Sequence, residues 1–212
     1  MRLYLSSFDL GNQPQRLVDL AGGARRIGVV VNALDHRESA REAWREAQTA
    51  KLAALGFTPT ELDLRHYFGR AEALREALAQ LDAIWINGGN AFILRRAMRQ
   101  SGFDTLIADA LARDAIVYAG FSAAAVIASA SLEALARVSD PLEVPPGYAP
   151  DIVMEGLGLL PYAVVVHYRS DHPESRAVEA EAAYYERHGI GYRTLSDGEA
   201  LVIDAAREEI VR

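Results

Sequence analysis

The sequence predicts an α/β fold, a three-layer sandwich in which helices cover both faces of a mostly parallel sheet. Short β-branched or aromatic segments alternate with stretches of helical period. Helices of about ten residues or more separate several of these segments, as the crossovers between parallel strands require. The 212 residues are half hydrophobic and about a quarter charged. This composition suits a large core, and we expect one domain over residues 1–212.

The first half of the chain gives the clearer elements. Strands are predicted at 2–7, 26–34, 60–64, 83–87 and 115–121, and helices at 14–21, 38–55, 71–80, 91–99 and 104–113. Pro14 suits the first turn of the first helix, and Gly22 would end it. In the second helix Trp44 and Leu52 lie near one apolar face, and Gly56 is a stop signal.

The second half begins with an irregular segment, because five of the eight prolines lie between residues 138 and 161. Long loops of this kind are often functional. A strand is predicted at 162–167, a helix at 173–188, and terminal strands near 192–195 and 200–205. Because the carboxyl ends of parallel strands are the usual place for a ligand, we expect the site there.

Charge and composition exclude several classes of function. The net charge of -7 disfavours a nucleic-acid partner, which would need a basic face. The absence of cysteine excludes disulfides, thiolate metal sites and a cysteine nucleophile. We expect no membrane partner and a cytoplasmic location, since neither a signal peptide nor an apolar span is apparent.

The strongest local motif is VYAGFSAAAVIASA, in which a buried strand runs through Ser122 into an alanine-rich helix. Such a sharp strand-to-helix turn lifts a serine hydroxyl above the sheet as a nucleophile. The turn needs small residues two positions before and after the serine, and Gly120 and Ala124 satisfy this. The alternative is that Ser122 only caps the helix.

A second strand end carries Gly88-Gly89-Asn90 before another helix. The backbone N–H groups of Gly89 and Ala123 could together form an oxyanion hole, since glycine lets the main chain approach a substrate carbonyl. An ordinary strand-to-helix turn is the alternative. The pairing of the two motifs favours a catalytic site.

His167 is the candidate base, because it closes the apolar strand AVVVH at its carboxyl end. His172 is expected at the surface, and the other histidines follow loops or helix ends. The acid that would orient the imidazole is sought between serine and histidine, among these carboxylates: Glu133, Asp140, Glu143, Asp151 and Glu155. Asp140 is favoured because Pro141 holds it at the start of the irregular segment.

With these residues the sequence resembles the peptidase E (α-aspartyl dipeptidase) family of serine peptidases and its relative cyanophycinase, whose fold is class I glutamine amidotransferase-like. The resemblance rests on GGN with the aromatic Phe92, on the G-x-S-A turn at Ser122, on Asp140, and on His167. One departure is Ala124, where the family usually has glycine. Alanine is still small enough for the turn.

The resemblance implies a Ser-His-Asp triad that hydrolyses short peptides through an acyl-enzyme, with dipeptides bearing N-terminal aspartate as substrates. It implies no metal or organic cofactor, and it suggests a homodimer. Arg169 and Arg176 would then pair with the aspartate side chain, and Asn90 could add a polar contact. The alternatives are a hydrolase of another substrate, such as a cyanophycinase-like enzyme, and a catalytically silent ligand-binding domain.

Overall fold

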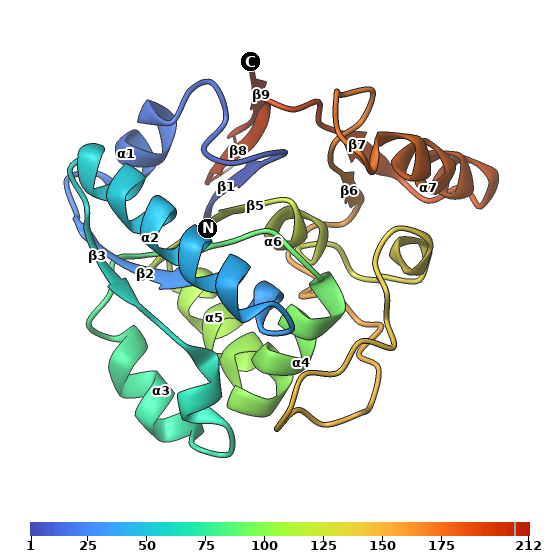
Figure 1. The fold of residues 1–212 in the computed structure, drawn as a ribbon. Helices are drawn as coiled ribbons and strands as arrows, with labels where there is room; N and C mark the ends of the chain where they lie inside the picture. Colours follow the sequence, from blue (N-terminus) through green and yellow to red (C-terminus); the bar gives the residue numbers. More distant parts are fainter. Residues whose placement is uncertain (206) are drawn as a thin grey trace.

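The computed structural model describes residues 1–205 and 207–212, and its centre is a seven-stranded sheet in the order β3-β2-β4-β5-β1-β8-β9 (Figure 1). Its strands are β1 (Arg2–Ser6), β2 (Arg26–Val30), β3 (Thr58–Glu61), β4 (Ala83–Ile86), β5 (Val117–Phe121), β8 (Ala200–Asp204) and β9 (Arg207–Val211). Strands β1 to β5 pair parallel with one another, and β8 pairs antiparallel with both β1 and β9. The predicted fold class is therefore confirmed.

Helices cover both faces of this sheet. They are α1 (Gln15–Ala21), α2 (Glu38–Ala54), α3 (Ala71–Leu78), α4 (Ala91–Ser101), α5 (Phe103–Ala112), α6 (Ala123–Val126) and α7 (Ser175–Arg187), with short 3₁₀ helices η1 (Asn32–Leu34), η2 (Leu64–Tyr67) and η3 (Ala134–Arg137). Apolar side chains of α1 and α2 pack on one face, and those of α3 to α6 on the other. Strands β4 and β5 are buried throughout, as strands between two helical layers must be.

Most sequence-based boundaries differ from the structure by one to two residues, strand β9 was not predicted, and three differences change the local structure. Residues 26–34 form β2 only as far as Val30 and then turn into η1. The strand predicted at 60–64 lies at Thr58–Glu61, because Asp63 caps η2 by accepting a hydrogen bond from Arg65 N. The predicted strands at 162–167 and 192–195 pair as β6 (Ala163–Val165) and β7 (Tyr192–Thr194) in a separate parallel sheet.

The irregular segment 138–161 is held by two arginines of α4. Arg96 is 1% exposed, and its guanidinium donates to the carbonyls of Pro141 at 2.7 Å and Asp151 at 3.0 Å. Arg95 donates to the carbonyl of Glu155 at 2.9 Å. Buried cations need such acceptors, and an irregular backbone has carbonyl groups that are not engaged in the hydrogen bonds of a helix or a sheet. The segment is therefore fixed against the helix that follows the Gly88-Gly89-Asn90 turn.

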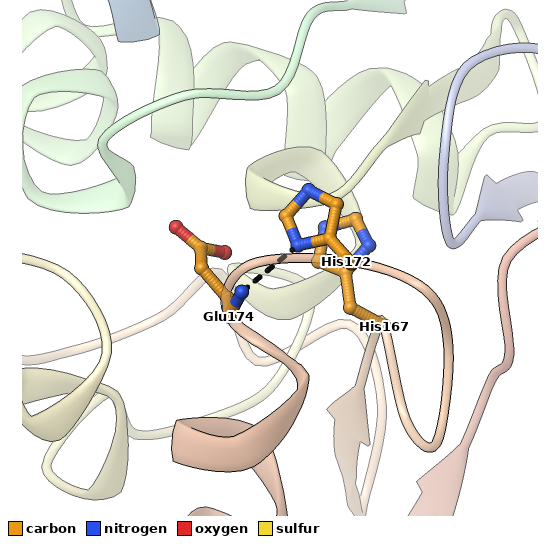
Figure 2. A group of neighbouring side chains, drawn as sticks. All are labelled: His167, His172 and Glu174. Atoms are coloured by element: carbon orange, nitrogen blue, oxygen red, sulfur yellow. Dashed lines mark hydrogen bonds between the residues drawn. The ribbon is translucent and has the colours of Figure 1, made fainter.

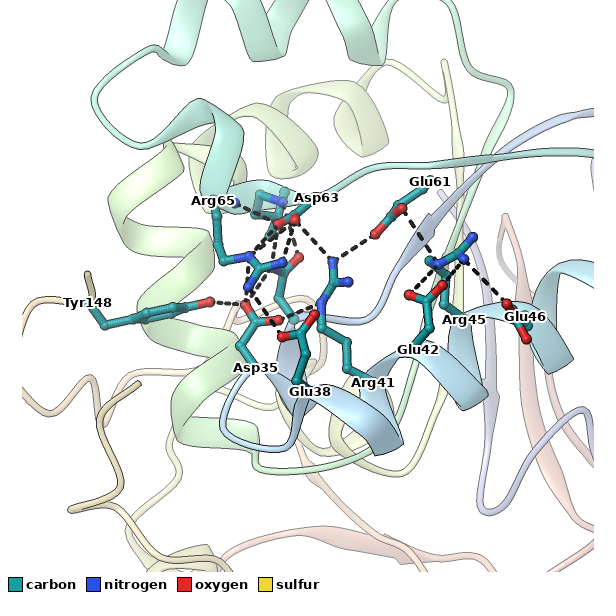
Figure 3. Close-up of polar contacts among 12 residues, drawn as sticks. Asp35, Glu38, Arg41, Glu42, Arg45, Glu46, Glu61, Asp63, Arg65 and Tyr148 are labelled. Carbon is teal, nitrogen blue, oxygen red and sulfur yellow. Dashed lines mark hydrogen bonds and ion pairs between the residues drawn. The ribbon is translucent and has the colours of Figure 1, made fainter. Parts of the chain in front are cut away.

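A mostly buried ionic network connects this segment to η1, α2 and η2 (Figure 3). Arg41 of α2 pairs with Asp35 at 2.8 Å and with Asp63 at 3.0 Å, and Arg65 pairs with Asp63 at 2.7 Å. Tyr148 of the irregular segment donates its hydroxyl to Asp35. The network therefore links the segment to α2 and to η1.

None of the helices in residues 1–205 and 207–212 is long and apolar enough to cross a membrane.

Candidate active site

Ser122 lies in a strained turn between β5 and α6. Its φ of 51° and ψ of -109° are unusual for a residue with a side chain, and such strain is typical of a nucleophile elbow. A Cβ at Gly120 would lie 2.3 Å from the carbonyl oxygen of Ile86, so only glycine fits there. Ala124 is fully buried within α6, which shows that the turn accommodates alanine at this position.

A continuous hydrogen-bonded chain starts at the Ser122 hydroxyl. The Oγ atom of Ser122 lies 3.1 Å from Nε2 of His167, and Nδ1 of His167 lies 2.7 Å from Oδ1 of Asp197. Because an ionised carboxylate only accepts, Nδ1 carries the proton and Nε2 is left to accept from the serine. The three side chains have the arrangement by which an imidazole deprotonates a hydroxyl.

Asp197 replaces Asp140 as the carboxylate beside the imidazole. The side chain of Asp140 instead accepts a hydrogen bond from Leu142 N at 2.8 Å, within its own turn. Asp197 reaches the site because β8 pairs antiparallel with β1, which brings the loop before β8 to the carboxyl end of β1. There Ser7 donates to Asp197 Oδ1 at 2.8 Å. The choice of Asp140 from the sequence is corrected on this ground.

His167 is almost completely buried, and its surroundings set its basicity. Burial lowers the pKa of His167, and the hydrogen bond with Asp197 opposes that shift. A base with a pKa below its ordinary value is neutral at pH 7 and can accept a proton. His172, expected at the surface, stacks on His167 with ring centroids 3.7 Å apart and an angle of 7° between the planes. Sequence position alone gave no sign of this contact.

Two backbone N–H groups near Ser122 have no acceptor in the described part of the chain. Ala123 is the first residue of α6, so its N–H has no intrahelical partner. Gly89 N–H donates to no protein group among the described residues. With a φ of 135° and the Ala33 carbonyl 2.7 Å from any Cβ, position 89 requires glycine. Both predicted oxyanion donors therefore stay free for a ligand.

An open pocket of about 430 Å³ surrounds Ser122 and His167. Its charged lining consists of Arg37, Asp140, Glu143 and Glu174 among the described side chains. Neither Arg169 nor Arg176 is part of it. Arg169 lies over the ring of Tyr168, with its guanidinium carbon 5.0 Å from the ring centroid. Both arginines are exposed.

Asn90 lines the pocket, but its amide is engaged within the protein. The oxygen caps α4 by accepting from Phe92 N and Ile93 N, and Nδ2 donates to the Asp140 carbonyl at 2.8 Å. Its main contribution is to join the Gly88-Gly89-Asn90 turn to the irregular segment. A substrate contact would have to replace one of these bonds.

His167, His172 and Glu174 form a group that could offer three ligand atoms to a metal (Figure 2). The geometry does not suit one. Stacked imidazoles direct their lone pairs along parallel planes, whereas tetrahedral coordination needs them to converge. Both ring nitrogens of His167 are also engaged, with Ser122 and Asp197. A bound metal would therefore break the hydrogen-bonded chain.

The sequence matches Peptidase family S51 over residues 20–211. The uncharacterized peptidase Lin0382 of Listeria innocua serovar 6a is 27% identical over an alignment of 162 residues, which covers 74% of this chain and 71% of that protein. Two solved structures share the fold. A Listeria monocytogenes EGD-e protein assigned as a peptidase E has a TM-score of 0.82 at 21% identity, over 100% of this chain and 98% of that one. A peptidase from an acI-B1 actinobacterium has a TM-score of 0.73 at 16% identity, over 99% and 86%. Since the family match spans most of the chain, this protein belongs to Peptidase family S51 and is a peptidase by that membership.

Proposed function

We propose that this protein is a serine peptidase that cleaves short peptides with Ser122 as nucleophile, His167 as general base and acid, and Asp197 as the orienting carboxylate. The observation that carries the proposal is the unbroken chain of contacts from Ser122 Oγ through His167 to Asp197. The two free N–H groups beside it add support. A silent ligand-binding domain would not need this combination.

In the proposed reaction, Ser122 Oγ attacks the peptide carbonyl carbon while His167 Nε2 takes the hydroxyl proton. The N–H groups of Gly89 and Ala123 stabilise the oxyanion of the tetrahedral intermediate. His167 then returns the proton to the leaving amine, which departs and leaves an acyl-enzyme. Water, deprotonated by His167, attacks the carbonyl carbon of the ester, and the imidazolium then returns this proton to Ser122 Oγ as the acid is released. Asp197 keeps the proton on Nδ1 and stabilises the imidazolium at each step.

Arg37 is the one arginine among the described side chains that line the pocket of about 430 Å³. A cation at this place favours substrates short enough to present a terminal carboxylate there. In this proposal its guanidinium pairs with the C-terminal carboxylate of a dipeptide. Arg37→Ala should then raise KM for dipeptides about tenfold and leave KM for C-terminally amidated dipeptides unchanged. Equal effects on both kinds of peptide would remove Arg37 from this role.

A preference for N-terminal aspartate is the finer expectation from the family resemblance. It requires a cation near the aspartate side chain, and Arg169 and Arg176 do not line the pocket. Among the described arginines, Arg37 is the one that lines the pocket and is the candidate for this contact. Hydrolysis of aspartyl dipeptides that is lost in Arg37→Ala and retained in Arg176→Ala would support this alternative.

The test of the proposed function is covalent labelling by a fluorophosphonate, followed by peptide mapping. We expect the label on Ser122 in the wild type and none in Ser122→Ala, which should lose at least about a thousandfold in peptide hydrolysis. Ser131→Ala, at an exposed serine, is the control and should keep both label and activity. A label on another residue, or full activity of Ser122→Ala, would contradict the serine mechanism.

A further inference from the structure

Three aromatic side chains form one wall of the pocket around Ser122 and His167, and they are Phe8, Trp44 and Phe121. Phe8 follows β1, Trp44 lies on α2, and Phe121 ends β5 directly before Ser122. The ring centroids of Phe8 and Phe121 lie 6.0 Å apart in an edge-to-face contact, and those of Trp44 and Phe121 lie 5.6 Å apart. Phe8 also packs on Trp44, with centroids 6.2 Å apart. The three rings therefore form one continuous surface, called the aromatic wall below.

Phe8 is the exposed member of the aromatic wall. It is 38% exposed, whereas Phe121 is 3% exposed. Trp44 and Phe121 also pack in the apolar core on one face of the sheet, so the fold itself accounts for them. Phe8 is not part of that core. An exposed aromatic ring in a pocket leaves apolar area that a ligand can cover.

The aromatic wall lies on the side of Ser122 from which the leaving group departs. An imidazole that protonates the leaving nitrogen must come within hydrogen-bond reach of it, so the leaving residue lies beside His167. Phe8 packs edge-to-face on the His167 imidazole, with ring centroids 6.1 Å apart. The oxyanion donors Gly89 and Ala123 line a separate, much smaller recess that none of the three aromatic side chains lines.

The position of Arg37 fits the same residue of the substrate. Arg37 immediately precedes α2, and Trp44 follows it by seven residues, or about two turns, so both lie on the same face of the helix. Both side chains line the pocket. A dipeptide whose C-terminal carboxylate pairs with Arg37 would therefore place the side chain of its second residue near the aromatic wall.

We propose that the aromatic wall is the subsite for the side chain of the leaving residue, and that it takes large apolar side chains such as leucine in preference to small ones such as alanine. This proposal rests on the peptidase function proposed above. The preference grows with the size of the side chain because each further methylene removed from water stabilises the complex. The pocket of about 430 Å³ has room for such a side chain.

The experiment measures kcat/KM for Asp-Leu and Asp-Ala with the wild type, Phe8→Ala, Phe8→Leu and Ile190→Ala. The two peptides share their first residue and both termini, so the ratio of their kcat/KM values isolates the leaving side chain. We expect the wild type to prefer Asp-Leu at least about tenfold. Phe8→Ala should lower that ratio at least about threefold, and Phe8→Leu should stay within about twofold of the wild type, because it keeps a large apolar side chain.

Ile190→Ala is the matched control. Ile190 is 42% exposed, about as exposed as Phe8, and it does not line this pocket. This variant should keep the wild-type ratio. Because Phe8 contacts His167, Phe8→Ala can also change the rate on both peptides, but a ratio cancels any common effect on the imidazole.

Failure of this proposal is separable from failure of the proposed function. Labelling of wild-type Ser122 by a fluorophosphonate reports the function independently of any peptide. If Ser122 is labelled, then equal or faster turnover of Asp-Ala, or an unchanged ratio in Phe8→Ala, overturns the role of the aromatic wall. If turnover is too slow to measure, the ratio is taken from the concentrations of the two peptides that half-protect Ser122 from labelling. Equal protection, or none, also overturns it.

Discussion

Two regions of this molecule bury carboxylates in opposite ways. Around Asp35 and Asp63 each buried carboxylate contacts an arginine. Burial would raise the pKa of Asp63, but hydrogen bonds from Arg65 and Asn32 outweigh it and hold the pKa at about 2. Among the described residues, the one hydrogen-bond donor to the Glu181 carboxylate is the Tyr185 hydroxyl, and burial raises the pKa of Glu181 to about 7. The paired carboxylates link α2, η1 and η2, whereas the unpaired one lies in the lining of a small pocket that Ser122 also lines.

The largest expected effect on stability comes from removing the cation of the paired region. Arg41→Met would leave the buried Asp35 and Asp63 to share Arg65, so that one of the two negative charges lacks a buried cation, and should lower the free energy of unfolding by about 3–5 kcal/mol. Arg45→Met is the control, because Arg45 pairs with Glu42 at the surface, where solvent screens the pair, and should cost much less. Urea unfolding at pH 7 measures both. Similar losses in the two variants would mean that burial does not distinguish these pairs.

For the unpaired carboxylate of Glu181, we expect substitution to raise the free energy of unfolding rather than lower it. The pKa of Glu181 is raised from 4.5 unfolded to about 7 folded, so the stability that Glu181 contributes is greatest below pH 4.5 and declines as the pH rises towards 7. Glu181→Gln should not show this decline, and above pH 7 its free energy of unfolding should exceed that of the wild type by up to about 3 kcal/mol. The measurement is urea unfolding from pH 4.5 to 8, with Glu179→Gln as the exposed control. A constant difference across this range would rule out titration of a buried Glu181.

At acid pH the paired region should show its own titration. The folded pKa of Asp63 lies below its ordinary value of 3.8, so the unfolded chain binds the proton first as the pH falls. The stability that Asp63 contributes above pH 4 is lost between about pH 4 and 2, and amounts to about 2 kcal/mol. Asp63→Asn should flatten this part of the stability curve. An equally steep curve in the variant would place the titration on other carboxylates.

The smallest effect concerns the link from the network to the irregular segment. Tyr148→Phe removes the hydroxyl that donates to Asp35 and should cost about 1–2 kcal/mol, with faster amide exchange in residues 138–161. Tyr168→Phe is the matched control, since no hydrogen bond of that hydroxyl occurs within the described residues. Unchanged exchange in Tyr148→Phe would show that Arg95 and Arg96 hold the segment without it.

The parts of the site that local sequence predicts are those built by a single strand end. Ser122, the Gly88-Gly89-Asn90 turn and His167 each follow a short apolar strand, and a strand that runs into a turn leaves a recognisable pattern. The parallel sheet then brings the ends of β4 and β5 together. The amino-acid pattern alone therefore predicts the fold class and the strand ends at which these residues lie.

The residues that local sequence does not reveal depend on distant pairing. Asp197 lies in a Ser-Asp-Gly turn near the end of the chain, and only the antiparallel pairing of β8 with β1 brings it to His167. A search restricted to carboxylates before the histidine could not reach it. Glu181 lies in the helical run EAEAAYYER, where nothing local separates a buried glutamate from the exposed ones around it.

The most direct test of the proposed catalytic chain compares two aspartates, Asp197→Asn and Asp140→Asn, by kcat/KM on whichever dipeptide the wild type cleaves fastest. Asparagine at 197 could hold the wrong imidazole tautomer, so we predict a loss of about 10³–10⁴-fold with the fold intact. Asp140→Asn should stay within about tenfold, since among the described residues its side chain accepts a hydrogen bond from Leu142 N alone, within its own turn. A large loss in Asp140→Asn together with near-normal activity of Asp197→Asn would contradict the Ser122–His167–Asp197 chain.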